Sequence, residues 1–227
     1  MAELAIAALV FLGLHILPAV KARQRLIRKI GDPAYMGLFS LASVLGLAWM
    51  ISAYKSAPVA EMLWVTGPVI RWLTASLMLF AFILVVTGVS TRNPSMVMSE
   101  DALKTSKPWA GIFAITRHPL MWGIALWAVL HLVNRPSMVS LLFFGTLALL
   151  AVAGSRLQEN RKREELGTAW QAFEEQTSFV PFAGIIDGSA KLSIAEIGGW
   201  RLAAATALWA LMLYAHGYIL GVPALPH

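Results

Sequence analysis

The sequence contains no cysteine among its 227 residues. This absence excludes disulfide bonds, thiolate nucleophiles, zinc sites built on cysteine and haem ligation by a thiolate. Any cofactor held by this chain therefore has to be bound by other side chains.

Charged residues are scarce as well. Only 13% of the residues are charged, whereas soluble domains usually carry about 25%. Hydrophobic residues make up 58% of the chain, the mean hydropathy is +0.69, and several apolar runs approach the ~20 residues that cross a bilayer. These features predict an all-α, polytopic membrane helix bundle in contact with lipid. The net charge of +6 does not indicate nucleic-acid binding, because the basic residues lie beside the apolar runs.

About six transmembrane helices are expected. They cover approximately residues 2–20, 35–54, 68–91, 119–134, 137–154 and 198–221. The first run lacks the basic leading region of a signal peptide, so we interpret it as a retained helix. The segment 155–195 is too polar to span a membrane. Leu166, Trp170 and Phe173 recur in it at helical spacing, which predicts an amphipathic helix on the cytoplasmic side.

The distribution of cations predicts the orientation. Of the 18 Lys and Arg residues, only Lys55, Arg71 and Arg135 lie in the loops on one side of the predicted bundle. Loops rich in Lys and Arg stay in the cytoplasm. Both termini are therefore expected on the opposite, outer side.

The fourth span begins with Arg117, His118 and Pro119. A residue before proline avoids the helical region, and proline favours the first helical position. His118 is therefore expected at the N-cap of this helix, beside Arg117 and free backbone donors, where an anion could bind. The alternative is a simple cap that anchors the helix in anionic headgroups.

Four histidines lie in or near the spans: His15, His118, His131 and His216. His15 and His131 lie deeper than His118, in a chain with no cysteine and few intramembrane carboxylates. Such imidazoles fit haem better than zinc or an iron–carboxylate site, although histidines that only pack against neighbouring helices remain an alternative. Along their helices, His15 lies ~9 Å and His131 ~18 Å from the cytoplasmic end of its predicted span. A haem bound by both histidines would therefore have to be tilted.

The haem hypothesis assigns roles to further residues. Trp122 and Trp127 flank the histidine segment and are candidates to line the pocket, with packing as the alternative. Arg23 and Arg117, together with Arg25, lie at the cytoplasmic end and are the expected partners of the haem propionates.

Five stretches in order resemble the NnrU family of bacterial membrane proteins over nearly the whole chain. They are a first-helix histidine followed by arginine (His15 and Arg23), "GDPAYMGLFSLASV", "TRHPLMWGIALWAVLHL", "REELGTAWQAFEEQTSFVPF" and "HGYILGVPALP". The resemblance implies a single domain over residues 1–227 in the bacterial inner membrane. It also implies a role in denitrification and nitric oxide metabolism, with other denitrification membrane proteins as partners.

The zeta-carotene isomerases are relatives of this family and bind haem b. The resemblance implies that their two haem-ligating histidines match His15 and His131. These relatives have a cysteine three residues before the second histidine, where this chain has Ala128. That difference argues against isomerase chemistry by ligand exchange.

A second resemblance is to the isoprenylcysteine and phospholipid methyltransferases. It rests on "RHP", followed after an intervening span by acidic residues and "LGTAWQAF". It implies an alternative cofactor, S-adenosylmethionine, bound at a cytoplasmic mouth around Arg117, His118, Glu165 and Trp170. A third alternative is a membrane partner protein without any cofactor. The choice among these three hypotheses leaves open whether the chain is an enzyme.

The cation distribution generates a test of topology. Reporter fusions after residue 29 and after residue 175 should report a cytoplasmic location, and a fusion at the C-terminus should report the outside. A cytoplasmic C-terminus would show that the spans have been miscounted, with residues 119–154 as the first segment to re-examine.

Overall fold

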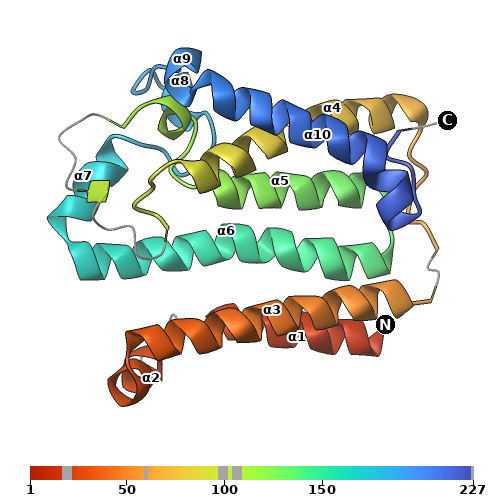
Figure 1. Cartoon of the computed structure of the whole chain (residues 1–227), viewed down its shortest axis with the longest axis horizontal. Coiled ribbons are helices and arrows are strands. Elements are labelled where there is room, and N and C mark those ends of the chain that lie inside the picture. Colours follow the sequence, from red (N-terminus) through yellow and green to blue (C-terminus); the bar gives the residue numbers. More distant parts are fainter. Residues whose placement is uncertain (17–21, 59–60, 97–101, 104–108, 226–227) are drawn as a thin grey trace.

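The computed structural model describes residues 1–16, 22–58, 61–96, 102–103 and 109–225. Within these residues it is a helical bundle without extended strands, apart from one isolated bridge between Met62 and Ser137. The predicted all-α membrane bundle is confirmed. Six long helices lie side by side along the longest axis of the molecule (Figure 1). They are α1 (Ala2–Ile16), α3 (Asp32–Ser56), α4 (Pro68–Ser90), α5 (Pro119–Asn134), α6 (Met138–Leu166) and α10 (Gly199–Leu220).

The helices form successive layers (Figure 1). The pair α1 and α3 covers one side of α6, α5 packs on the other side of α6, α4 packs on α5, and α10 packs on α4. Polar contacts fasten α10 to α4 at two levels. The indole Nε1 of Trp209 donates to the carbonyl of Ala75 at 2.9 Å, and Nε of Arg201 donates to the hydroxyl of Ser90 at 3.1 Å.

Four of the helices are long and apolar enough to cross a membrane: α3, α4, α6 and α10. Helices α1 and α5 are apolar but shorter, with 15 and 16 residues. The predicted first span extended to residue 20, but residues 17–21 lie outside the described part of the chain.

Helix α6 differs from the sequence prediction. The span was expected to end at residue 154, with a separate amphipathic helix after it, but α6 continues without interruption to Leu166. Its 29 residues correspond to roughly 43 Å, whereas the hydrocarbon core is about 30 Å thick. Gly167, with φ of 54°, ends the helix and starts α7 (Thr168–Glu175). The polar segment 156–166 is therefore a continuation of the apolar helix α6 and not a separate helix.

The short elements gather at one end of the bundle (Figure 1). They are α2 (Ala22–Ile30), the 3₁₀ helix η3 (Gly111–Ala114), α7, α8 (Ala183–Ile186) and α9 (Ile194–Ile197). We call this the cation-rich end, because the described basic residues of the predicted cytoplasmic loops lie there. The opposite, cation-poor end contains the ends of α3, α5 and α10.

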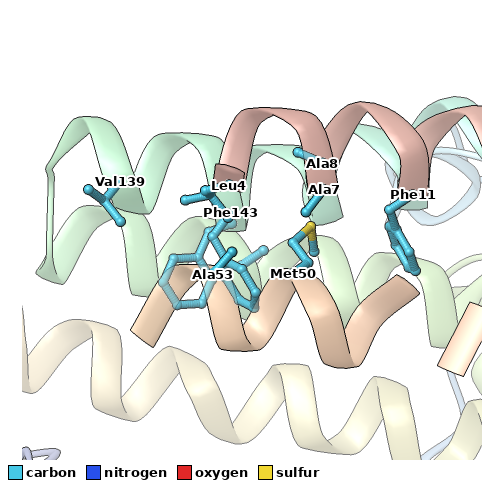
Figure 2. Packing of buried hydrophobic residues seen from close by; sticks show 10 residues of the cluster. Leu4, Ala7, Ala8, Phe11, Met50, Ala53, Val139 and Phe143 are labelled. Atoms are coloured by element: carbon cyan, nitrogen blue, oxygen red, sulfur yellow. The ribbon is translucent and has the colours of Figure 1, made fainter. Parts of the chain in front are cut away.

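An apolar cluster joins α1, α3, α5 and α6 (Figure 2). Its fully buried members include Leu4, Ala7, Met50 and Ala128, each with no exposed surface. Small residues on α1 let this helix approach α3 and α6 closely, and Phe143 and Phe144 of α6 fill the remaining space. The ring of Tyr54, near the end of α3, packs on both phenylalanines.

The layers α4 and α5 approach each other through two glycines. A Cβ atom added at Gly88 would lie 2.5 Å from the backbone nitrogen of Leu120, and one at Gly123 would lie 3.0 Å from the carbonyl oxygen of Ala81. Small residues at such positions allow membrane helices to pack backbone against backbone. This contact fixes the start of α5 against α4.

Replacing these glycines should destabilise the bundle. Gly88→Ala places a methyl group against backbone that cannot move aside, at a cost of about 1–3 kcal/mol. The midpoint of thermal unfolding in detergent should fall accordingly. Gly145→Ala is the matched control, because the nearest atom to its Cβ is a leucine methyl at 3.6 Å. Equal midpoints for the two variants would contradict the close approach.

Candidate functional site

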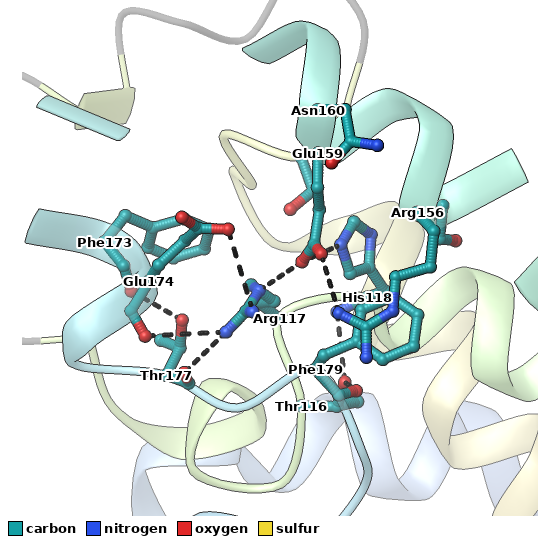
Figure 3. Close-up of polar contacts among 12 residues, drawn as sticks. Thr116, Arg117, His118, Arg156, Glu159, Asn160, Phe173, Glu174, Thr177 and Phe179 are labelled. Atoms are coloured by element: carbon teal, nitrogen blue, oxygen red, sulfur yellow. Dashed lines mark hydrogen bonds and ion pairs between the residues drawn. The ribbon is translucent and has the colours of Figure 1, made fainter. Parts of the chain in front are cut away.

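The cation-rich end contains a buried ion cluster where α5 begins (Figure 3). His118 is the N-cap of α5, with φ of −120°, and Pro119 occupies the first helical position, as the sequence predicts. The cluster centres on Glu159, on the extension of α6. Its Oε1 accepts hydrogen bonds from Nε of Arg117 and, at 3.0 Å, from Nε2 of His118.

The segment after α7 completes the cluster. The Nη1 of Arg117 donates to the carbonyl of Thr177 at 2.6 Å, and Glu174 lies 3.9 Å from the same guanidinium group. The hydroxyl of Thr116 and the indole of Trp122 both donate to the carbonyl of Phe179. The loop after α7 is thereby fastened along the start of α5.

Burial determines the protonation of the pair. The side chains of His118 and Glu159 are each 1% exposed. The apolar part of α6 ends at Gly154, so both groups lie beyond the membrane-spanning segments. Burial lowers the pKa of His118 against the opposing effect of Glu159, which favours a neutral imidazole that donates its Nε2–H. For Glu159, burial alone would raise the pKa of the carboxyl group. The hydrogen bonds from His118 and Arg117 and the charge of Arg117 have the larger effect, and the pKa is lowered to about 2.

The cluster serves as an anchor. An anion was expected beside Arg117 and His118, and the structure supplies one from within the chain, the carboxylate of Glu159. No surface of this imidazole is open to a substrate. The geometry fits a contact that holds α5, α6 and the loop after α7 together.

The mouth expected for S-adenosylmethionine is not assembled. Glu165 is 41% exposed and lies 3.6 Å from Arg23 and 3.8 Å from Arg161, away from the buried pair of Arg117 and His118. Trp170 is completely buried in an apolar cluster with Phe173. Neither side chain is presented to a ligand together with His118.

His15 lies near the end of α1 at the cation-rich end. Its Nδ1 donates to the carbonyl of Phe11 at 2.8 Å, and its ring packs on the rings of Phe11 and Phe39. Arg23, expected to bind a propionate, instead lies 3.6 Å from Glu165 and over the ring of Tyr35.

His131 lies near the end of α5 at the cation-poor end. Its Nδ1 donates to the carbonyl of Trp127 at 2.8 Å. The imidazole packs on the ring of Trp127 and stacks on Phe144, with centroid distances of 4.6 and 4.9 Å. On its other side lies His216 of α10, with ring centroids 6.3 Å apart.

The structure does not bring His15 and His131 together. His15 packs against Phe39 of α3. His131 stacks on Phe144, which packs against Tyr54, a second residue of α3. Phe39 and Tyr54 are fifteen residues apart, or roughly 22 Å along the helix axis. One metal ion needs both nitrogens within about 2 Å. A single haem iron between these two histidines does not fit this arrangement.

The other expected haem residues divide between the two ends. Trp127 packs on the ring of His131 at the cation-poor end. Trp122 belongs to the cation-rich end, where it binds the carbonyl of Phe179. Arg117 is committed to Glu159, Glu174 and Thr177, and so it is not placed to bind a propionate near His131.

Two residues of the ion cluster were missed from the sequence, and the residue that lies beside His216 was not predicted. Glu159 and Glu174 are two of several acidic residues in a highly charged stretch, and nothing in the spacing separates them from Glu164, Glu165 and Glu175. His216 was recognisable as a histidine in a span, but only the fold shows that it faces His131.

Comparisons with known proteins identify a matching family and one relative. The family model described as NnrU protein matches residues 3–224. The chain is 33% identical over 103 residues to the chloroplastic 15-cis-zeta-carotene isomerase of Zea mays. That alignment covers 45% of this chain but only 28% of the relative. No solved structure matches the chain.

Removing Glu159 should destabilise the cation-rich end. Glu159→Ala leaves the guanidinium of Arg117 buried without its nearest carboxylate, which typically costs ~3–5 kcal/mol. Thermal unfolding in detergent should show a clearly lower midpoint. Glu165→Ala is the matched control on the same helix, since exposed ion pairs contribute at most about 1 kcal/mol. Similar midpoints for both variants would contradict the anchoring role.

Proposed function

The chain belongs to the NnrU family, and on that premise we propose that it is a haem b protein of the bacterial inner membrane. In this proposal His131 is the histidine that holds the iron, and the protein supports nitric oxide metabolism during denitrification. Haem b supplies an iron centre that can bind nitric oxide and carry single electrons. The work of the chain is to bind and orient that group inside the bilayer.

The observation that carries this proposal is the hydrogen bond of His131. A carbonyl oxygen can only accept, so the bond to Trp127 puts the proton of the neutral imidazole on Nδ1 and leaves a lone pair on Nε2. Metal-binding histidines usually have this arrangement, because the second bond fixes the ring and its tautomer. The rings of Trp127 and Phe144 beside it offer an apolar wall for a macrocycle.

The cations at this end are suitable for the propionates. Arg71, in the first turn of α4, donates from Nη2 to the carbonyl of Pro223 at 3.4 Å, close to the chain segment that contacts His216. Arg135 is the C-cap of α5, four residues after His131, and is exposed. These two residues replace Arg23 and Arg117 of the sequence-based assignment, which lie at the other end.

The alternatives have less support. The named activity of the maize relative is not carried over, because the alignment covers only 28% of that protein. The resemblance also implies a cysteine where this chain has Ala128. Methyl transfer from S-adenosylmethionine lacks an assembled pocket around His118, as described above. Calorimetry with S-adenosylmethionine should accordingly detect no saturable binding.

The visible spectrum of the purified protein tests the proposal. Protein produced with ample haem supply and purified in detergent should show a Soret band, and His131→Ala should lose at least most of it. Val129→Ala is the matched control, because this residue lies on the same helix and is 47% exposed. It should keep the full band.

His15→Ala separates the present assignment from the one implied by resemblance alone. We expect this variant to keep its haem, because His15 lies at the opposite end of the bundle. Loss of the band in His15→Ala would favour the His15 and His131 pair. A colourless wild-type protein would overturn the proposed function itself.

A further inference from the structure

We propose that α2 lies in the membrane interface at the cation-rich end of the bundle, where its basic side chains bind the phosphate headgroup of an anionic phospholipid. The occupant of this site is a lipid of the surrounding leaflet. The site lies at the end of the bundle away from His131, so its test does not require bound haem.

Helix α2 separates its charges from its apolar side chains. Its nine residues, "ARQRLIRKI", contain four cations and no acidic residue. Arg25 and Lys29 are four residues apart and therefore share one face of the helix. Leu26 and Ile30 share the adjacent face for the same reason. Helices of this kind lie in a membrane interface, with the apolar face toward the acyl chains and the cations toward the headgroups.

Both faces are open to the surroundings. Leu26 and Ile30 are 44% and 37% exposed. Arg25, Arg28 and Lys29 are exposed as well. Within the described residues, these three cations have no carboxylate within ion-pair distance. The helix therefore has an apolar face and a basic face that the rest of the protein does not cover.

The turn between α2 and α3 places α2 at the level where the lipid-facing surface begins. Gly31 has a φ of 81°, which glycine adopts easily, and a proline in the first turn of α3 follows it. Helix α2 consequently does not continue along α3 but lies across its end, at the edge of the bundle (Figure 1). The first large exposed apolar side chain of α3 is Leu38, roughly 9 Å along the axis from Asp32.

A hollow beside α2 offers room for the headgroup. Its volume is about 450 Å³, and its lining consists of Arg23, Ile27, Arg28, Asp32 and Glu165. Glu165 already pairs with Arg23 at 3.6 Å, so these two residues add little net charge. Arg28 is then the cation of the hollow that a phosphate oxygen can contact. Asp32 can accept a hydrogen bond from a headgroup hydroxyl, which phosphatidylglycerol supplies.

The charge of the helix favours an anionic phospholipid over a zwitterionic one. Lys and Arg residues clustered beside a transmembrane helix attract anionic headgroups. A zwitterionic lipid also carries a phosphate, but its ammonium group would lie among three unpaired cations. Only one carboxylate of the hollow, that of Asp32, has no cationic partner to offset them. Phosphatidylglycerol brings no such positive charge.

Native mass spectrometry of the full chain in detergent tests the binding. The wild-type protein should retain added phosphatidylglycerol in preference to phosphatidylethanolamine. Arg28→Ala should weaken this binding about five-fold, the change expected for one cation near an anionic surface. Lys55→Ala is the matched control, because this exposed cation lies at the other end of α3, and it should bind as the wild type does. Equal retention of the two lipids by the wild type, or equal binding by the two variants, would overturn the site.

The absence of cysteine permits a second measurement that leaves Arg28 in place. A nitroxide attached through Leu26→Cys, in protein reconstituted into bilayers containing phosphatidylglycerol, should collide more with oxygen, which concentrates among acyl chains, than with a water-soluble nickel chelate. A nitroxide attached through Lys29→Cys should show the reverse preference. Preferential collision of both labels with the nickel chelate would place α2 in water and overturn its interfacial position.

Discussion

The burial of one carboxylate organises the cation-rich end of the bundle. Glu159 is almost completely enclosed, and a buried charge is tolerated only where opposite charge and hydrogen-bond donors surround it. Arg117 and His118 meet this requirement, and they are the two residues immediately before α5. The start of α5 is therefore held against α6 through the carboxylate of Glu159, which also accepts from Nη1 of Arg156 at 3.1 Å. The loop after α7 joins the same cluster because Arg117 has donors left for Thr177 and Glu174.

Much of this architecture can be predicted from the sequence. The all-α membrane bundle follows from the scarcity of charge and the length of the apolar runs. The N-cap position of His118 follows from the steric effect of Pro119 on the residue before it. These features depend on local chemistry, and local chemistry is what a single sequence displays.

The pairing between distant residues could not be predicted. The anion facing Arg117 is one of several carboxylates in a charged stretch, and only the continuation of α6 past Gly154 selects Glu159. Likewise, the depth of each histidine along its own helix did not reveal which helices are neighbours. Helix α6 packs on α5 and brings Phe144 to His131, and near the end of α10, which packs on α4, His216 also approaches His131, while His15 remains at the far end of α1.

Helix α6 contacts both the region around His131 and the ion cluster around His118. Phe144 stacks on His131 near one end of the helix, and Glu159 binds His118 near the other, with fifteen residues or roughly 22 Å of unbroken helix between them. A helix that continues without a break holds the residues along it in fixed relative positions. Because one helix carries both Phe144 and Glu159, the packing around His131 and the ion cluster around His118 cannot be repositioned independently of each other.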